Sequence, residues 1–140
     1  MGVKRFIVTG GCGFIGSNFI HHIFHKYCCV DHSSCCPDHD RFVTESGIEE
    51  IEVMNVDSMT YAGNEENLNG IRHLDNYHFS KTDITNFEGM EEVFSRFKPD
   101  VVIHFAAESH VDRSIESGME FVKTNVLGTQ ILLDLSRQYE

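Results

Sequence analysis

Residues 3–16 read VKRFIVTGGCGFIG, and this stretch decides the fold. Its first half, residues 3–9, is apolar enough to predict a strand buried on both faces of a sheet. The glycines that follow match G-x-G-x-x-G from Gly11 and G-x-x-G-x-x-G from Gly10. A pyrophosphate sits against backbone amides at a helix N-terminus, where Cβ atoms would block its approach. A buried strand, this loop and an amphipathic helix together predict a dinucleotide-binding turn.

The rest of the chain alternates strands with helices. Apolar residues predict further strands at 49–57, 77–82 and 101–107. Apolar residues also recur at helical spacing between the strands and after them, and Thr85 and Glu88 have the spacing of a capping box. Such alternation implies right-handed crossovers and a parallel sheet. We predict an α/β fold, a Rossmann-type parallel sheet of about four strands in the order 3-2-1-4 with flanking helices.

The length and the net charge of the chain limit its possible functions. The chain has 140 residues, so we assign residues 1–140 to a single nucleotide-binding domain. Its 22 acidic and 11 basic residues give a net charge of -11, which argues against a nucleic-acid surface because such a surface needs a basic stripe. No apolar run approaches the roughly 20 residues of a membrane span, and the first residues lack a signal-peptide cleavage site. The expected location is the cytoplasm.

The glycine motif also requires an acidic residue about 20 positions further on, at the end of the next strand, to bind the ribose hydroxyls. The best candidate is Asp57, which lies 41 residues after Gly16. A carboxylate at this position repels a 2′-phosphate, so we expect NAD rather than NADP as the cofactor. The extra length indicates an insertion at about residues 28–47, a polar stretch with two vicinal cysteine pairs.

This insertion contains potential zinc ligands. They are Cys29, His32, Cys35 and His39, but their spacing matches no standard zinc finger. A long polar surface loop without metal accounts for the same residues, and so does an erroneous or alternative exon. We therefore expect no metal site.

Other stretches of the chain resemble a known family. Residues 57–64 read DSMTYAGN, residues 104–114 read HFAAESHVDRS and residues 124–129 read TNVLGT, with Asp-Ile at 83–84 between them. Together with the glycine loop they resemble the extended short-chain dehydrogenases/reductases that act on nucleotide sugars. Within this NAD-dependent epimerase/dehydratase family they resemble the dehydratases more than the epimerases. The likeness covers the whole chain except the insertion.

The resemblance implies a set of site residues. The cofactor-binding residues would be Gly10, Gly13, Phe14, Ile15 and Gly16 at the pyrophosphate, Asp57, Ser58, Met59, Thr60, Asp83 and Ile84 around the adenosine, Ala106, Ala107, Glu108 and Ser109 under the nicotinamide half, and Thr124. His110 would face the nucleotide-sugar substrate. Taken alone, Asp83 could simply end a strand and Thr124 could lie on a helix surface. His104, inside an apolar strand, is better interpreted as a hydrogen-bonded core histidine than as a ligand.

The catalytic residues of the family are not found in this sequence. The resemblance implies a lyase reaction that starts with NAD oxidising the sugar and needs a Tyr-x-x-x-Lys pair on a helix and an Asp-Glu pair. Tyr77 and Lys81 have this spacing, but in a strand four residues span about 13 Å, against about 5–6 Å on a helix. We therefore assign no catalytic residue to the chain.

Three functions fit these observations. We expect a C-terminally truncated NAD-binding portion of a nucleotide-sugar dehydratase, inactive by itself, for which a homodimer is an open option. The alternatives are a non-catalytic NAD-binding module and a fragment of a related epimerase. The fourth strand would be an exposed edge of the sheet, which favours self-association.

Overall fold

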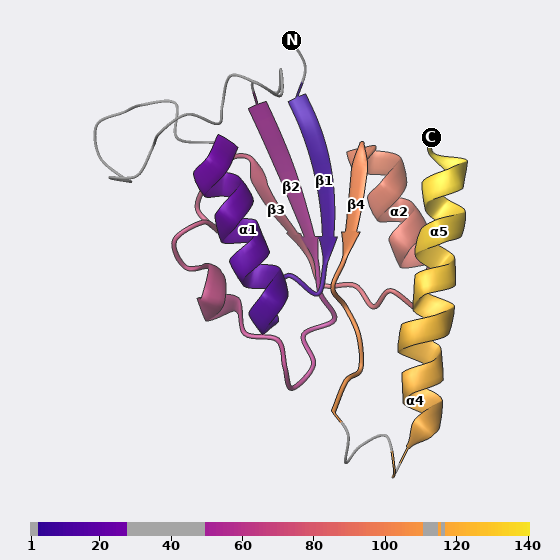
Figure 1. The fold of residues 1–140 in the computed structure, drawn as a ribbon. Coiled ribbons are helices and arrows are strands. Elements are labelled where there is room, and N and C mark those ends of the chain that lie inside the picture. Colours follow the sequence, from indigo (N-terminus) through magenta and orange to yellow (C-terminus); the bar gives the residue numbers. More distant parts are fainter. Residues whose placement is uncertain (1–2, 28–49, 111–114, 116) are drawn as a thin grey trace.

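The fold is a parallel sheet between two layers of helices (Figure 1). The computed structural model describes residues 3–27, 50–110, 115 and 117–140. The elements follow in the order β1 (Val3–Thr9), α1 (Phe14–Tyr27), β2 (Glu50–Val56), the 3-10 turn η1 (Glu65–Leu68), β3 (Tyr77–Ser80), α2 (Phe87–Phe97), β4 (Val101–His104), α4 (Gly118–Val122), the π-helical segment η2 (Lys123–Gly128) and α5 (Thr129–Gln138). The strands are parallel in the order β3-β2-β1-β4, which confirms the predicted Rossmann-type sheet.

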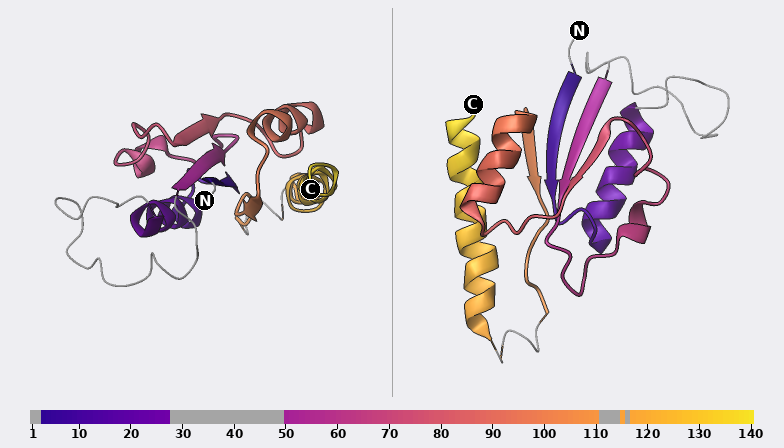
Figure 2. Two further views of the ribbon diagram at one scale, coloured as in Figure 1. Left: turned by 90° about the horizontal axis from the view of Figure 1, so that it is seen from above. Right: turned by 180° about the vertical axis from the view of Figure 1, so that it is seen from behind.

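Each face of the sheet carries its own core. Helix α1 covers one face, and α2 with the long C-terminal helix covers the other (Figure 2). Successive residues of β1 alternate between the two cores: Phe6 and Val8 pack under α1, whereas Ile7 packs under α2 and α5. A strand with period 2 and helices on both faces must be apolar at nearly every position. This explains the apolar run that identified β1.

The strand register aligns the carboxyl ends of all four strands. Thr9 of β1 pairs with Val56 of β2 and with His104 of β4, and Val56 pairs with Ser80 of β3. These residues form one row across the sheet. The chain therefore leaves the four strands at the same end of the sheet. Open parallel sheets bind their ligands at this carboxyl end.

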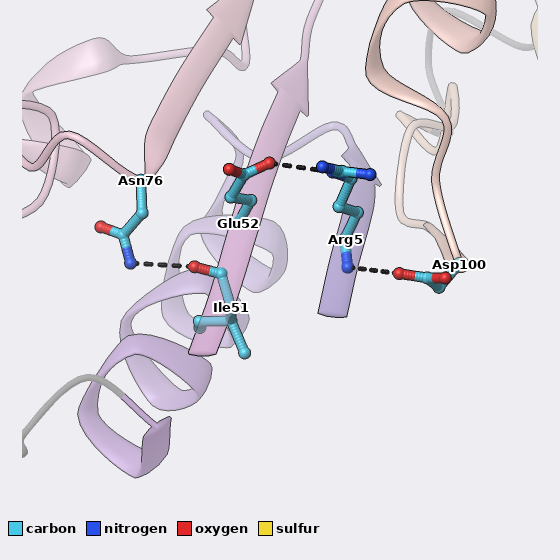
Figure 3. Close-up of polar contacts among 5 residues, drawn as sticks. All are labelled: Arg5, Ile51, Glu52, Asn76 and Asp100. Atoms are coloured by element: carbon cyan, nitrogen blue, oxygen red, sulfur yellow. Dashed lines mark hydrogen bonds and ion pairs between the residues drawn. The ribbon is translucent and has the colours of Figure 1, made fainter. Parts of the chain in front are cut away.

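Polar contacts fix the opposite edge (Figure 3). The Arg5 guanidinium lies 3.1 Å from a Glu52 carboxylate oxygen, and the Arg5 amide donates to Asp100 Oδ2 at 2.7 Å. Asn76 Nδ2 donates to the carbonyl oxygen of Ile51 at 2.9 Å. The ion pair is partly exposed, so it contributes at most about 1 kcal/mol. The contacts tie the starts of the strands together, at the end of the sheet away from their carboxyl ends.

The observed elements differ from the predicted ones at the ends of two strands and at one helix cap: β3 ends at Ser80 and β4 at His104, whereas the predicted strands extended to residues 82 and 107. Asn86 caps α2 through Oδ1, which accepts from the Gly89 amide at 3.1 Å, so the capping box at Thr85 was wrong. Thr85 lies one residue before the cap, where its amide and its hydroxyl both donate to Asp83 Oδ1 at 2.8 Å. The helical stretch at the C-terminal end contains the π-helical segment η2 between α4 and α5.

Among the helices of the described residues, none is both long enough and apolar enough to cross a bilayer.

Candidate functional site

A cavity of about 190 Å³ lies at the carboxyl ends of the strands. It brings together most residues that the sequence singled out. Those that line it are Gly10, Gly13, Asp57, Ser58, Thr60, Asp83, Ile84, Ala106, Ala107, Glu108 and Thr124. They come from five separate segments of the chain, and the aligned strand ends explain why these segments meet.

Several predicted site residues lie outside the cavity lining. They are Phe14, Ile15, Gly16, Met59, Ser109 and His110. Phe14 and Ile15 form the first turn of α1 and are 84% and 65% exposed. The ring of His110 lies 6.2 Å from that of Tyr61. Their assigned roles stay predictions.

The glycines of the loop are required for different reasons. Gly10 has φ +68, and a Cβ there would lie 2.6 Å from the Ala106 amide nitrogen. A Cβ on Gly16 would overlap the Gly10 carbonyl, and a Cβ on Gly11 would overlap the Asn55 side chain. These three glycines are needed for packing within the protein.

Gly13 is the exception, because packing within the protein does not demand a glycine there. A Cβ on Gly13 would meet only the Gly10 carbonyl oxygen, at 3.4 Å, while the residue lines the cavity. A glycine is needed at this position only if another group approaches the backbone. Helix α1 begins at the next residue, so its first-turn amides, which have no partner within the helix, are available to an anion. The loop therefore fits a pyrophosphate.

Asp57 links the glycine loop to the end of β2. The residue is only 8% exposed. Both carboxylate oxygens accept hydrogen bonds from backbone amides: Cys12 N donates to Oδ2 at 3.0 Å, and Met59 N donates to Oδ1 at 2.8 Å. Met59 has φ 57, which turns the chain back over the carboxylate. A carboxylate offers about four lone-pair sites, so two sites stay available to ligand hydroxyls. This geometry suits a ribose.

The loop after β4 closes the other side of the cavity. The Asn125 side chain holds the Glu108 backbone at both ends: the Glu108 amide donates to Asn125 Oδ1 and Asn125 Nδ2 donates to the Glu108 carbonyl, each at 2.8 Å. The Tyr61 hydroxyl donates to Glu108 Oε2 at 3.3 Å. The segments that follow β2, β4 and α4 therefore meet at Glu108, through its carboxylate on one side and its backbone on the other.

Sequence reasoning missed part of the lining. The missed residues are Val56, Ala62, Gly63, Thr82, Phe105 and Glu120. Most of them adjoin or lie within the quoted stretches, so extending each stretch by a residue would have found them. Glu120 gives no such signal, because its position depends on how the C-terminal helix packs.

A polar cluster lies under the glycine loop. Asn55 Nδ2 donates to the Tyr77 hydroxyl oxygen at 2.9 Å and to Cys12 Sγ at 3.4 Å. Burial raises the pKa of the Cys12 thiol to about 11 and that of Tyr77 to about 12. Both groups are therefore neutral at physiological pH. Tyr77 lies on β3 and Lys81 is exposed just beyond it, so the Y-x-x-x-K spacing is structural, as predicted.

These raised pKa values predict a loss of stability in alkali. The unfolded chain releases the Cys12 proton near pH 9.0 and the Tyr77 proton near pH 10.0, whereas the folded chain keeps both to higher pH. The free energy of unfolding should therefore be unaffected by these groups below about pH 9 and fall as the pH rises towards 12, by up to about 1.4 kcal/mol per pH unit for each group. Urea unfolding followed by circular dichroism measures it. Cys12→Ala should remove the earlier part of the fall and Tyr77→Phe the later part; unchanged profiles in both variants would contradict the assignment.

Comparison with known proteins identifies the family to which the chain belongs. The fold and the site define a Rossmann-type nucleotide-binding protein. The sequence model of the family described as GDP-mannose 4,6 dehydratase matches residues 40–140, and the chain belongs to this family.

Several dehydratases and epimerases are similar to the chain along most of its length. The chain is 40% identical, over 99% of its length, to the dTDP-glucose 4,6-dehydratase of Neisseria gonorrhoeae, and covers 34% of that protein. The crystal structure of the dTDP-glucose 4,6-dehydratase DesIV from Streptomyces venezuelae, with NAD and TYD bound, is 36% identical with a TM-score of 0.75, over 97% of this chain and 36% of that one. The UDP-glucose 4-epimerase of Thermotoga maritima, solved with UDP-glucose, is 30% identical with a TM-score of 0.71, over 97% and 35%. The chain thus spans about a third of the length of these relatives.

Proposed function

We propose that this chain is the NAD-binding portion of a dTDP-glucose 4,6-dehydratase, a lyase that converts dTDP-glucose to dTDP-4-keto-6-deoxyglucose and water. One observation carries the cofactor proposal: the cavity brings Gly13, whose side-chain position is open, next to the nearly buried carboxylate of Asp57. A backbone cradle beside a ribose acceptor is the arrangement that dinucleotides require. The named relatives support the reaction.

The residues that line the cavity and their neighbours in the chain would divide the dinucleotide between them. The glycine loop lies at the end of β1 and would hold the pyrophosphate through Gly10, Gly13, Phe14, Ile15 and Gly16. The adenosine would lie on the β2–β3 side, with its ribose on Asp57 and its base near Ser58, Met59, Thr60, Asp83 and Ile84. The nicotinamide half of the dinucleotide would then lie on the β4 side, near Ala106, Ala107, Glu108, Ser109 and Thr124.

When bound, NAD supplies the hydride acceptor of the reaction. The residues of this chain orient it and exclude water around it. His110 would face the sugar nucleotide, and no residue of this chain is assigned a proton-transfer role. A polypeptide of these residues should therefore bind the cofactor without turnover.

The remaining assignments are proposals of the same kind. The substrate would be a nucleotide sugar, dTDP-glucose, and the site of action the cytoplasm. A homodimer is supported by exposed apolar side chains on the C-terminal helix, among them Met119, Val122, Val126 and Leu133. The epimerase alternative is less favoured because the identity to the epimerase structure is 30%, against 36% for the dehydratase.

Cofactor selectivity tests the proposal. The chain should bind NAD at least about ten-fold more tightly than NADP, because the Asp57 carboxylate repels a 2′-phosphate. Titration calorimetry with both dinucleotides measures this ratio. Asp57→Asn should reduce the ratio, whereas Asp75→Asn, at an exposed position away from the cavity, should leave it unchanged. Equal binding of NAD and NADP by the unmodified chain would remove Asp57 from its role, and binding of neither would overturn the proposed function.

A further inference from the structure

A histidine behind the cavity connects two strands to the C-terminal helix. His104 ends β4, and its ring makes two hydrogen bonds: Nδ1 lies 2.6 Å from Thr9 Oγ1 at the end of β1, and Nε2 lies 3.1 Å from Thr129 Oγ1 at the start of α5. His104 is not among the residues that line the cavity. Its ring nevertheless lies between β1, which leads into the glycine loop, and α5, which follows the η2 segment that contacts Glu108.

The neighbours of the ring fix the direction of each hydrogen bond. The Thr129 hydroxyl lies 2.7 Å from the carbonyl oxygen of Asn125, which can only accept, so Thr129 donates there and accepts from His104 Nε2–H. A neutral ring that carries its proton on Nε2 can only accept at Nδ1, so the Thr9 hydroxyl donates there, while its oxygen accepts from the Ala106 amide at 3.3 Å. The neutral Nε2–H tautomer satisfies all of these contacts.

Burial favours the same neutral state. It lowers the pKa of His104 below its ordinary value, because the charged ring loses hydration in this position. The side chains bonded to the ring are hydroxyls, so no carboxylate among them stabilises the charged form.

The chain of contacts continues into the wall of the cavity. Asn125 lies in η2, where the helix departs from its regular hydrogen-bond pattern, and its carbonyl is held by Thr129. Its side chain holds both backbone groups of Glu108. The position of Glu108 relative to the sheet therefore depends on the contact between His104 and Thr129.

We infer that His104 is a positioning residue for the β4 side of the dinucleotide site: through Thr129 and Asn125 it holds the Glu108 segment in place. This inference rests on the proposed function. Asp57, on the adenosine side of the site, is held by the Cys12 and Met59 amides instead, and the segment after β2 reaches Glu108 only at its carboxylate, through the Tyr61 hydroxyl. The two halves of the dinucleotide should therefore respond differently when the contact is removed.

A matched pair of variants tests the inference. Thr129→Val keeps the shape of the side chain and removes the hydroxyl, whereas Thr129→Ser keeps the hydroxyl. Because the hydroxyl's hydrogen bonds to His104 and to the Asn125 carbonyl are both lost, Thr129→Val should weaken NAD binding about three- to ten-fold, and it should leave ADP binding unchanged. Thr129→Ser should restore NAD binding. Titration calorimetry of the full chain with NAD and ADP measures both.

Nuclear magnetic resonance adds a readout that does not need a ligand. The ¹⁵N shifts of His104 should show the neutral Nε2–H tautomer at neutral pH, and the Glu108 amide signal should move in Thr129→Val but not in Thr129→Ser. A charged ring, an Nδ1–H tautomer, or an equal loss of NAD and ADP binding in Thr129→Val would overturn the inference. If the unmodified chain binds neither ligand, the proposed function fails, and the resonance data alone decide the role of His104.

Discussion

Gly13→Val is expected to abolish NAD binding and leave the fold intact. A Cβ at this position meets only the Gly10 carbonyl oxygen, at 3.4 Å, so packing within the protein leaves room for a side chain to begin there. The branched chain would fill the space beside the α1 amides that a pyrophosphate needs. We expect a loss of affinity on the order of 100-fold or more, which corresponds to at least about 2.7 kcal/mol. Titration calorimetry measures the affinity, and circular dichroism with urea unfolding checks the fold.

Gly70 provides the control for this substitution. It is exposed, does not line the cavity, and a Cβ there would come no closer than 3.8 Å to the His21 ring. Gly70→Val should therefore bind NAD as the unmodified chain does. A Gly13→Val variant that retains full affinity would mean that the pyrophosphate does not lie on this loop.

Gly10→Ala should differ from Gly13→Val, because it should lower the stability of the fold as well as the affinity for NAD. Its φ of +68 is strained for an alanine, and the new Cβ would lie 2.6 Å from the Ala106 nitrogen and 2.8 Å from the Ala106 Cα. Both neighbours are backbone atoms of the segment after β4, so they cannot move aside as a side chain would. The cost should be about 3 kcal/mol or more of the free energy of unfolding.

Urea unfolding compares this variant with Gly13→Ala. The Gly13 variant should be nearly as stable as the unmodified chain, because its Cβ makes only an ordinary contact. If the two variants were equally stable, the approach of the β4 segment to the glycine loop would not be a constraint on the fold.

The sequence predicts the central part of the fold well. The predicted first strand has the same bounds as β1, and the predicted strand order is the observed one. Both follow from physical rules that act locally or through topology: buried parallel strands need apolar residues on both faces, and crossovers are right-handed. Asp57 could be proposed as the ribose ligand despite the insertion, because such a residue follows a strand whatever the number of residues before it, and the structure places Asp57 in the cavity lining.

Features that depend on competition between neighbours were not predictable in this way. Thr85 has the pattern of a helix cap, but the nearby Asp83 carboxylate takes its hydroxyl and Asn86 caps the helix instead. The roles of Asn125 and Thr129 depend on which strand the C-terminal helix packs against. Sequence spacing carries no information about such contacts, because the partners lie on different elements.

The strand register has a consequence for how the chain tolerates change. Helix α1 ends at Tyr27 and β2 begins at Glu50, both at the end of the sheet away from the cavity (Figure 1). In general, doubling the number of residues between two elements adds only about 0.6 kcal/mol in closure entropy. The site is held by the Asp57–Cys12 hydrogen bond and by the pairing of Thr9 with Val56, both at the far ends of the strands. The α1–β2 connection is therefore the natural place to add a purification tag, a fluorophore or a foreign sequence without disturbing the ligand.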